Sequence, residues 1–237
     1  MLIKTRIVQN IFSDKSSLVV RALLANPKHR WTIPELSQKE KISTGLVMAV
    51  FKVLQEEGFL ERYPAGRFSY TRLRDPEKLL AKWVHHYRFS QNRQVQFYSE
   101  QKGLLAKIRK YLMEECIPYA LTLFSGAALV APYVRDQGNA LYIGVSEEDA
   151  EGALWKIQSR FSLIPPKAGG NICFTLPFYK SSVFRDARAI RGFQVVSNLH
   201  LYLDLINYPM VGAEQAEWLK ARLKEKGTPI IGGEKQP

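Results

Sequence analysis

Apolar residues near the start of the chain recur with the period of short amphipathic helices. In SLVVRALLAN, one side of a helix would collect four of them: Leu18, Val19, Ala22 and Leu23. This spacing predicts a first helix with one buried face. In WTIPELSQKEKIS, Thr32 and Glu35 have the spacing of a capping box, and Pro34 is tolerated in a first helical turn. A short second helix is therefore predicted over residues 33–40.

The segment ISTGLVMAVFKVLQEEGFLER predicts a third helix. Its apolar stripe has i, i+3, i+4 and i+7 spacing: Val47, Val50, Phe51 and Leu54. Ser43 is a good N-cap, and Gly58 readily takes the left-handed conformation that ends a helix. The opposite side is small near its start and basic further along: Thr44, Gly45, Met48, Ala49 and Lys52. Small residues let a helix approach the floor of a DNA groove, where a hydroxyl or an ammonium group can reach base edges or phosphates.

Two strand-like segments, FLERY and FSYTRL, follow this helix and are separated by the turn PAGR. A hairpin directly after such a helix is typical of the wing of a winged helix-turn-helix. Arg67 at its tip, with Arg62 nearby, is placed to touch phosphates or the minor groove. The predicted DNA-binding residues are therefore Lys41, Ser43, Thr44, Gly45, Met48, Lys52, Arg62 and Arg67. A winged helix can instead serve as a protein-interaction module, and the pattern leaves that alternative open.

The rest of the chain alternates helix and strand signals. DPEKLLAKWVHHYRF predicts a helix that begins with Asp and Pro, and the polar segment SQNRQVQFYSEQ predicts a linker. Further on, helical patterns alternate with short apolar, strand-like segments such as YALTLF, ALYIGV, SLIPP and NICFTLPF. This alternation predicts an α/β domain with a mixed sheet, so the chain as a whole is expected to be α+β.

Four regions are expected from these patterns. Residues 1–74 would form the winged helix-turn-helix domain, and residues 75–100 a linker helix and connector. Residues 101–228 would form the C-terminal α/β domain, and residues 229–237 a poorly ordered tail.

The charge distribution favours a nucleic-acid partner for the first half of the chain. Residues 1–110 hold 21 lysines and arginines against nine aspartates and glutamates, whereas residues 111–237 hold 13 of each. The whole net charge of +12 therefore falls in the first part. Such asymmetry is typical of a polyanion-binding part joined to a neutral part, and the plain alternative is that these charges only keep the protein soluble.

Motifs for catalysis are missing from the sequence. Ser125 and Gly126 follow a strand and open a helix, as in the nucleotide-binding turn of nucleotidyltransferases, but the next strand lacks the paired carboxylates that hold metal ions. Asp204 lies in a helical pattern without a neighbouring carboxylate, and His200 lies among apolar residues typical of a core. A P-loop, a Rossmann fingerprint and a metal cluster are also missing. We therefore expect no enzyme activity, no cofactor and no metal site.

The two cysteines and the hydropathy bear on the compartment. Cys116 and Cys173 are too few for a disulfide framework and too widely spaced for a zinc site, so we expect both to be reduced core residues. No apolar run approaches the roughly 18 residues that span a bilayer. The N-terminus has no recognisable signal peptide. A cytoplasmic location without a membrane partner is therefore expected.

Four stretches in a fixed order carry a family resemblance: LLAKWVHHYRF, YALTLFSGAALVAPYVR, VVSNLHLYLDL and GAEQAEWL. Together with the N-terminal pattern, they make residues 16–222 resemble the AbiEi-type regulators, the antitoxins of type IV toxin–antitoxin systems. The resemblance implies a winged helix that binds operator DNA and represses its own operon. It also allows two copies of the chain to bind the DNA as a dimer. It also implies a nucleotidyltransferase-like but non-catalytic C-terminal domain that counteracts a nucleotidyltransferase-like toxin without a stable complex.

Other regulators with the same architecture remain open. A ligand-responsive transcription factor would share the DNA-binding half and use its C-terminal domain to bind a small molecule. A solitary regulator without a toxin would also fit, and a protein-interaction scaffold would show no salt-dependent DNA binding.

Overall fold

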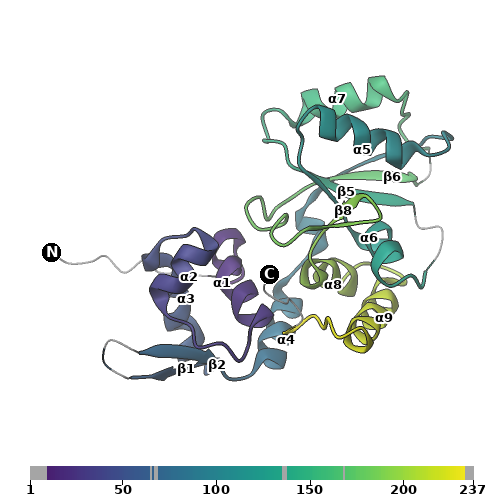
Figure 1. The fold of residues 1–237 in the computed structure, drawn as a ribbon. Coiled ribbons are helices and arrows are strands. Elements are labelled where there is room, and N and C mark those ends of the chain that lie inside the picture. Colours follow the sequence, from purple (N-terminus) through teal and green to yellow (C-terminus); the bar gives the residue numbers. More distant parts are fainter. Residues whose placement is uncertain (1–9, 65, 67–68, 135–137, 168, 233–237) are drawn as a thin grey trace. The chain divides into compact units, whose positions relative to one another are not determined.

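The computed structural model describes residues 10–64, 66, 69–134, 138–167 and 169–232. The chain falls into two compact units, Met1–Tyr87 with Leu223–Pro237, and Arg88–Arg222. The first unit therefore contains segments from both ends of the chain. Its elements are α1 (Asp14–Ala25), α2 (Ile33–Glu40), α3 (Thr44–Glu56), β1 (Leu60–Tyr63), β2 (Tyr70–Leu73) and α4 (Pro76–His86), shown in purple to blue in Figure 1.

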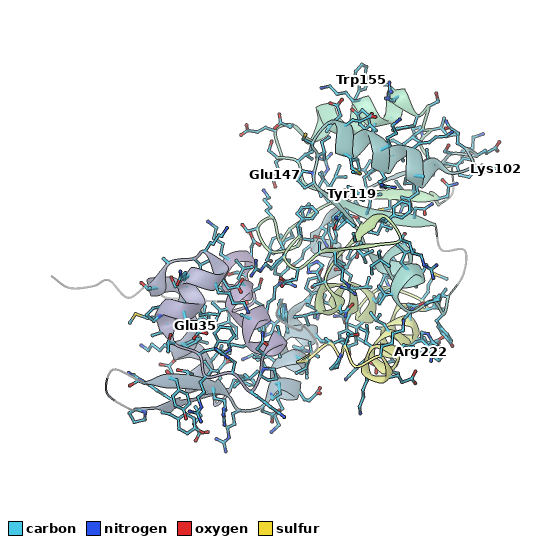
Figure 2. The ribbon with its side chains drawn as sticks, viewed as in Figure 1. Glu35, Lys102, Tyr119, Glu147, Trp155 and Arg222 are labelled. Carbon is cyan, nitrogen blue, oxygen red and sulfur yellow. The ribbon has the colours of Figure 1, made fainter. Side chains whose placement is uncertain are left out.

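The helix boundaries of this unit follow from capping side chains. The Thr32 hydroxyl accepts a hydrogen bond from the Glu35 amide, and the Glu35 carboxylate accepts one from the Thr32 amide, so the predicted capping box is confirmed. Glu35 is labelled at this position in Figure 2. The Ser43 hydroxyl accepts from the Leu46 amide at 3.2 Å and opens α3. Gly58, which follows α3, has a φ of +76°, a conformation that favours glycine.

The core of the first unit is apolar and draws on every helix. The predicted stripe of α3 is buried: Val47, Val50, Phe51 and Leu54. Phe12 stacks on Trp83 of α4 with ring centroids 5.5 Å apart. Leu223 and Ile230 are also buried, and the Gly232 amide donates to the Leu24 carbonyl. The prediction of a poorly ordered tail is therefore wrong for residues 229–232.

Strands β1 and β2 form an antiparallel hairpin in which Leu60 lies opposite Leu73 and Tyr63 opposite Tyr70. The outer edge of β2 is paired as well, because Trp31 forms an isolated antiparallel bridge with Thr71. The hairpin is thus held to the residue that precedes the cap of α2.

The second unit contains a mixed sheet. Its described strands are β3 (Arg93–Phe97), β4 (Tyr119–Leu121), β5 (Asn139–Ile143), β6 (Ile172–Leu176), β7 (Arg188–Ile190) and β8 (Phe193–Val195). The order is β3-β6-β5-β4-β8-β7, with β5–β6 and β4–β8 parallel and the other pairs antiparallel. The predictions of an α+β chain and a mixed sheet are confirmed.

Helices cover both faces of this sheet. They are α5 (Leu104–Glu114), α6 (Leu123–Val130), α7 (Ala150–Arg160) and α8 (Asn198–Ile206). A short 3-10 turn, η1, lies at Phe89–Gln91, and α9 (Gly212–Glu225) follows α8 and crosses into the first unit at Leu223. Figure 1 shows α5 and α7 along one face and α6 and α8 along the other.

Three predictions about this unit are wrong. The segment predicted as a linker, residues 90–101, contains β3, which pairs with β6 along five residues of each strand. The polar side chains of β3 are compatible with a strand because it lies at the sheet edge. The segment SLIPP forms only an isolated bridge, between Ile164 and Tyr98. Cys116 is exposed rather than a core residue, and Cys173 is half-buried in β6.

Candidate functional site

One side of α3 is open to solvent and carries four of the eight predicted DNA-binding residues. Thr44, Gly45, Met48 and Lys52 are all exposed, and Met48 retains 54% of its accessible surface. Ala49, predicted on the same side, is only 4% exposed, so that prediction is wrong. Because α1, α2 and β1 all contact α3, more of its circumference is covered than a single apolar stripe would require.

The residues before α3 have local structural roles. Lys41 is exposed and has a left-handed backbone with a φ of 53°, which turns the chain from α2 into α3. Ser43 is exposed as well, but its hydroxyl is engaged in capping. Gly45 lies in the first turn, and a Cβ atom built there meets no heavy atom within 4 Å. The start of α3 is therefore both small and unobstructed.

A groove of about 490 Å³ runs between α3, the start of α2 and the β1–β2 hairpin. Its walls include Met48, Lys52 and Gln55 from α3, Arg62 from β1 and Tyr70 from β2. The structure thus brings together Met48, Lys52 and Arg62, which sequence reasoning placed on two separate elements. Lys41, Ser43, Thr44 and Gly45 lie outside the groove lining, at the start of α3. Arg67 lies outside the described residues.

The cations of the groove keep much of their solvent exposure. The Lys52 Nζ lies 3.9 Å from Glu56 Oε1, and both side chains are more than 60% exposed. Exposed pairs of this kind contribute little, about 0.3–0.5 kcal/mol, so the Lys52 ammonium is readily redirected to an anion. Arg62 is exposed on β1, opposite Thr71.

Sequence reasoning missed three residues beside these cations. Gln55 follows Met48 by seven positions on the same side of α3, so helical spacing could have found it. Arg30 lies with its guanidinium carbon 4.9 Å from the centroid of the Tyr70 ring, and Tyr70 stacks on Tyr63 at 4.8 Å. The Arg30–Tyr70 contact joins residues 40 positions apart, and local pattern has no signal for it.

The carboxylate of Glu61 raises the pKa of a tyrosine in the hairpin. The Tyr63 hydroxyl donates to Glu61 Oε2 at 2.7 Å, and this hydrogen bond raises the pKa of Tyr63. The same hydrogen bond places the Glu61 carboxylate beside the Tyr63–Tyr70 stack.

The polar residues considered for catalysis in the second unit are committed to packing. The Ser125 hydroxyl accepts a hydrogen bond from the Ala140 amide at 2.6 Å. A Cβ atom on Gly126 would lie 3.0 Å from the Leu201 side chain, which accounts for glycine there. Asp204 is fully buried and accepts hydrogen bonds from the hydroxyls of Thr122 and Tyr142.

His200 is fully buried one turn before Asp204, as the apolar pattern predicted. Within the ranges that the structure describes, no cluster of three or more His, Cys, Asp or Glu side chains is placed to hold a metal ion. Over those same ranges, no helix has the length and apolar character that crossing a membrane requires.

Comparison with known proteins assigns the chain to a family. The family described as transcriptional regulator, AbiEi antitoxin, type IV toxin–antitoxin system, matches residues 72–223, which is more than half of the chain. No curated protein and no solved structure gives a significant match. The match covers α4 and the whole of the second unit, and it agrees with the resemblance seen in the sequence. The chain belongs to the AbiEi antitoxin family of transcriptional regulators from type IV toxin–antitoxin systems.

Proposed function

We propose that the first unit is a winged helix-turn-helix that binds operator DNA, and that the protein represses its own operon. In this proposal α3 is the recognition helix and the β1–β2 hairpin is the wing. The observation that carries it is the shared groove, in which Lys52 on the exposed side of α3 lies with Arg62 of β1. Cations from two elements along one groove suit a DNA backbone, which places phosphates at regular intervals.

The first turn of α3 supports base contact. Recognition helices usually present their N-terminal residues to base edges. Thr44 and Gly45 occupy that turn, are exposed, and leave room for close approach. Lys41 lies just before the turn, where an ammonium can contact a phosphate. In the proposal, Arg67 contributes a further phosphate contact from the wing.

The second unit would supply the antitoxin function. We propose that it counteracts a nucleotidyltransferase-like toxin without a stable complex and without chemistry of its own. The family assignment supports the antitoxin role, since the matched residues fall mainly in this unit. The burial of Asp204 supports the absence of chemistry, because its carboxyl group is enclosed and hydrogen-bonded to Thr122 and Tyr142.

Salt-dependent DNA binding tests the first part of the proposal. The full chain would be titrated with a duplex selected from a random pool, at several salt concentrations. Lys52→Ala and Arg62→Ala should each weaken binding and flatten the slope of log K against log salt by about one unit. Lys110→Ala is a matched control, because Lys110 is similarly exposed and lies 3.8 Å from Glu114 in the same i, i+4 arrangement.

The control should bind like the unchanged protein. Loss of binding in Lys110→Ala equal to that in Lys52→Ala would show that general charge, rather than the groove, attracts DNA. Absence of any salt-dependent DNA binding would favour a protein-interaction module instead.

A second function, regulation by a small molecule, is favoured by a cavity of about 480 Å³ in the second unit. Its lining is mostly apolar and includes Leu105, Phe124 and Phe193, with Ser125 and Asn139 as polar groups. Such a lining suits an uncharged ligand. An effector that bound there would change the Kd for the selected duplex, and Phe124→Trp would abolish that change by filling the cavity.

A further inference from the structure

Met48 is an unusual residue for the exposed side of α3. Its neighbours along that side, Thr44 one turn before and Lys52 one turn after, are polar. A single exposed apolar side chain is common on protein surfaces and carries no meaning alone. The groove gives this one a context, because Met48 lines it together with the apolar side chains of Ile33, Pro34 and Phe51.

The apolar strip lies between polar and cationic groups. Phe51 is buried at the base of the groove, whereas Ile33 is half-buried and Pro34 is exposed at the start of α2. Lys52 and Arg62 line the same groove. A ligand that complements this groove therefore carries a small apolar group next to a negatively charged group. In duplex DNA, the 5-methyl group of thymine is the apolar feature of the major groove, and it lies beside the phosphate backbone.

We propose that Met48, with Ile33 and Pro34, reads the 5-methyl group of a thymine, while Lys52 and Arg62 hold the adjacent phosphates. The inference rests on the proposed function, since it assumes that α3 enters the major groove. Methionine suits this contact because its flexible, polarisable side chain adapts to a methyl group without a fixed shape. Met48 is then the residue that distinguishes thymine from cytosine at one position of the operator.

Uracil substitution isolates the methyl group. 2′-Deoxyuridine pairs with adenine as thymidine does and lacks only the 5-methyl group. A duplex selected by the full chain from a random pool would be remade with uracil at one thymine at a time. At the position read by Met48, affinity should fall about fourfold, the equivalent of one buried methylene group. At the other thymines, affinity should stay unchanged.

Three variants assign the effect to Met48. In Met48→Ala the thymine and uracil duplexes should bind equally at that position, because the apolar partner is lost. Met48→Leu should keep most of the preference for thymine. Met113→Ala is a matched control, because Met113 is 57% exposed, close to the 54% of Met48, and lies on α5 of the second unit. This control should keep both the affinity and the thymine preference.

The outcomes separate the inference from the function on which it rests. Sequence-specific binding that is insensitive to uracil at every thymine would overturn the inference and leave the DNA-binding proposal standing. The same holds if Met48→Ala keeps the full thymine preference while thermal melting shows that it is folded. Absence of salt-dependent DNA binding by the unchanged chain would overturn the proposed function itself.

Discussion

Trp31 and Thr71 exchange two backbone hydrogen bonds, with both N···O distances at 2.8 Å. The bridge ties the hairpin to the residue before the capping box of α2, and both residues are buried. Because β2 is held on both edges, Arg62 on β1 stays beside α3 in the groove. The orientation of the hairpin therefore depends on a residue that lies far from it in sequence.

Replacing Trp31 by alanine should destabilise the first unit. The side chain is 1% exposed, contacts the His29 ring at 4.3 Å, and would leave a cavity. Loss of a buried tryptophan costs about 3–5 kcal/mol, which urea denaturation followed by circular dichroism would measure. Tyr133→Ala, which removes a half-exposed ring, is the comparison. An equal loss in both variants would contradict a special role for Trp31.

Replacing Gly45 by alanine should stabilise the fold slightly and weaken DNA binding. The added Cβ meets no heavy atom within 4 Å, and alanine favours the helix by about 0.5–1 kcal/mol. The free energy of unfolding should rise slightly. Binding to the selected duplex should nevertheless weaken, because the added methyl group lies in the turn proposed to approach the bases. Unchanged affinity, with Gly45→Trp also binding normally, would remove α3 as the reader.

Replacing Asp204 by alanine should destabilise the second unit without affecting DNA contacts directly. The hydroxyls of Thr122 and Tyr142 both donate to this fully buried carboxylate, and the variant leaves them without their acceptor. Leaving a buried polar group without its hydrogen-bond partner costs about 1–3 kcal/mol, so a loss of roughly 2–5 kcal/mol is expected for the two hydroxyls. Denaturant titration would measure it, and Asp149→Ala, at an exposed carboxylate, should change little.

The two thiols should react at different rates with Ellman's reagent. Cys116 is exposed just after α5, whereas burial raises the pKa of the Cys173 thiol in β6. Because the thiolate is the reactive form, a raised pKa leaves less of it at neutral pH. One thiol should react rapidly in the folded protein, and the second should react more slowly until the protein is unfolded. In Cys116→Ser the rapid phase should disappear, and its persistence would contradict the assignment.

Short-range features of the first unit could be predicted because their causes are local. The capping box at Thr32 and Glu35, the N-cap at Ser43 and the apolar stripe of α3 each depend on residues within a few positions. The exposure of Met48 and Lys52 followed from the same helical period. Such features need only backbone geometry and side-chain chemistry.

Long-range features could not be predicted because a local sequence pattern does not show which distant residue a side chain or strand will contact. The helical period places Ala49 on the exposed side of α3, but α1, α2 and β1 all contact this helix and Ala49 is buried. The segment of β3 has only a short alternation, in which Val95 and Phe97 alternate with glutamines, and the polar residues around it obscured this signal until its pairing with β6 was seen. The meeting of Met48 with Arg62 in one groove likewise depends on how the hairpin folds back, which spacing alone does not specify.

In covalent terms the second unit is an insertion within the first. The chain leaves the first unit after Tyr87 and returns at Leu223, where Leu223 and Ile230 complete the core. A fragment that stops near residue 100 would therefore lose part of its own interior, although it keeps every proposed DNA contact. Unfolding the insertion would lengthen the loop that the first unit must close, at a cost of about 0.6 kcal/mol for each doubling. The stability of the proposed DNA-binding unit thus depends on a second unit that remains folded.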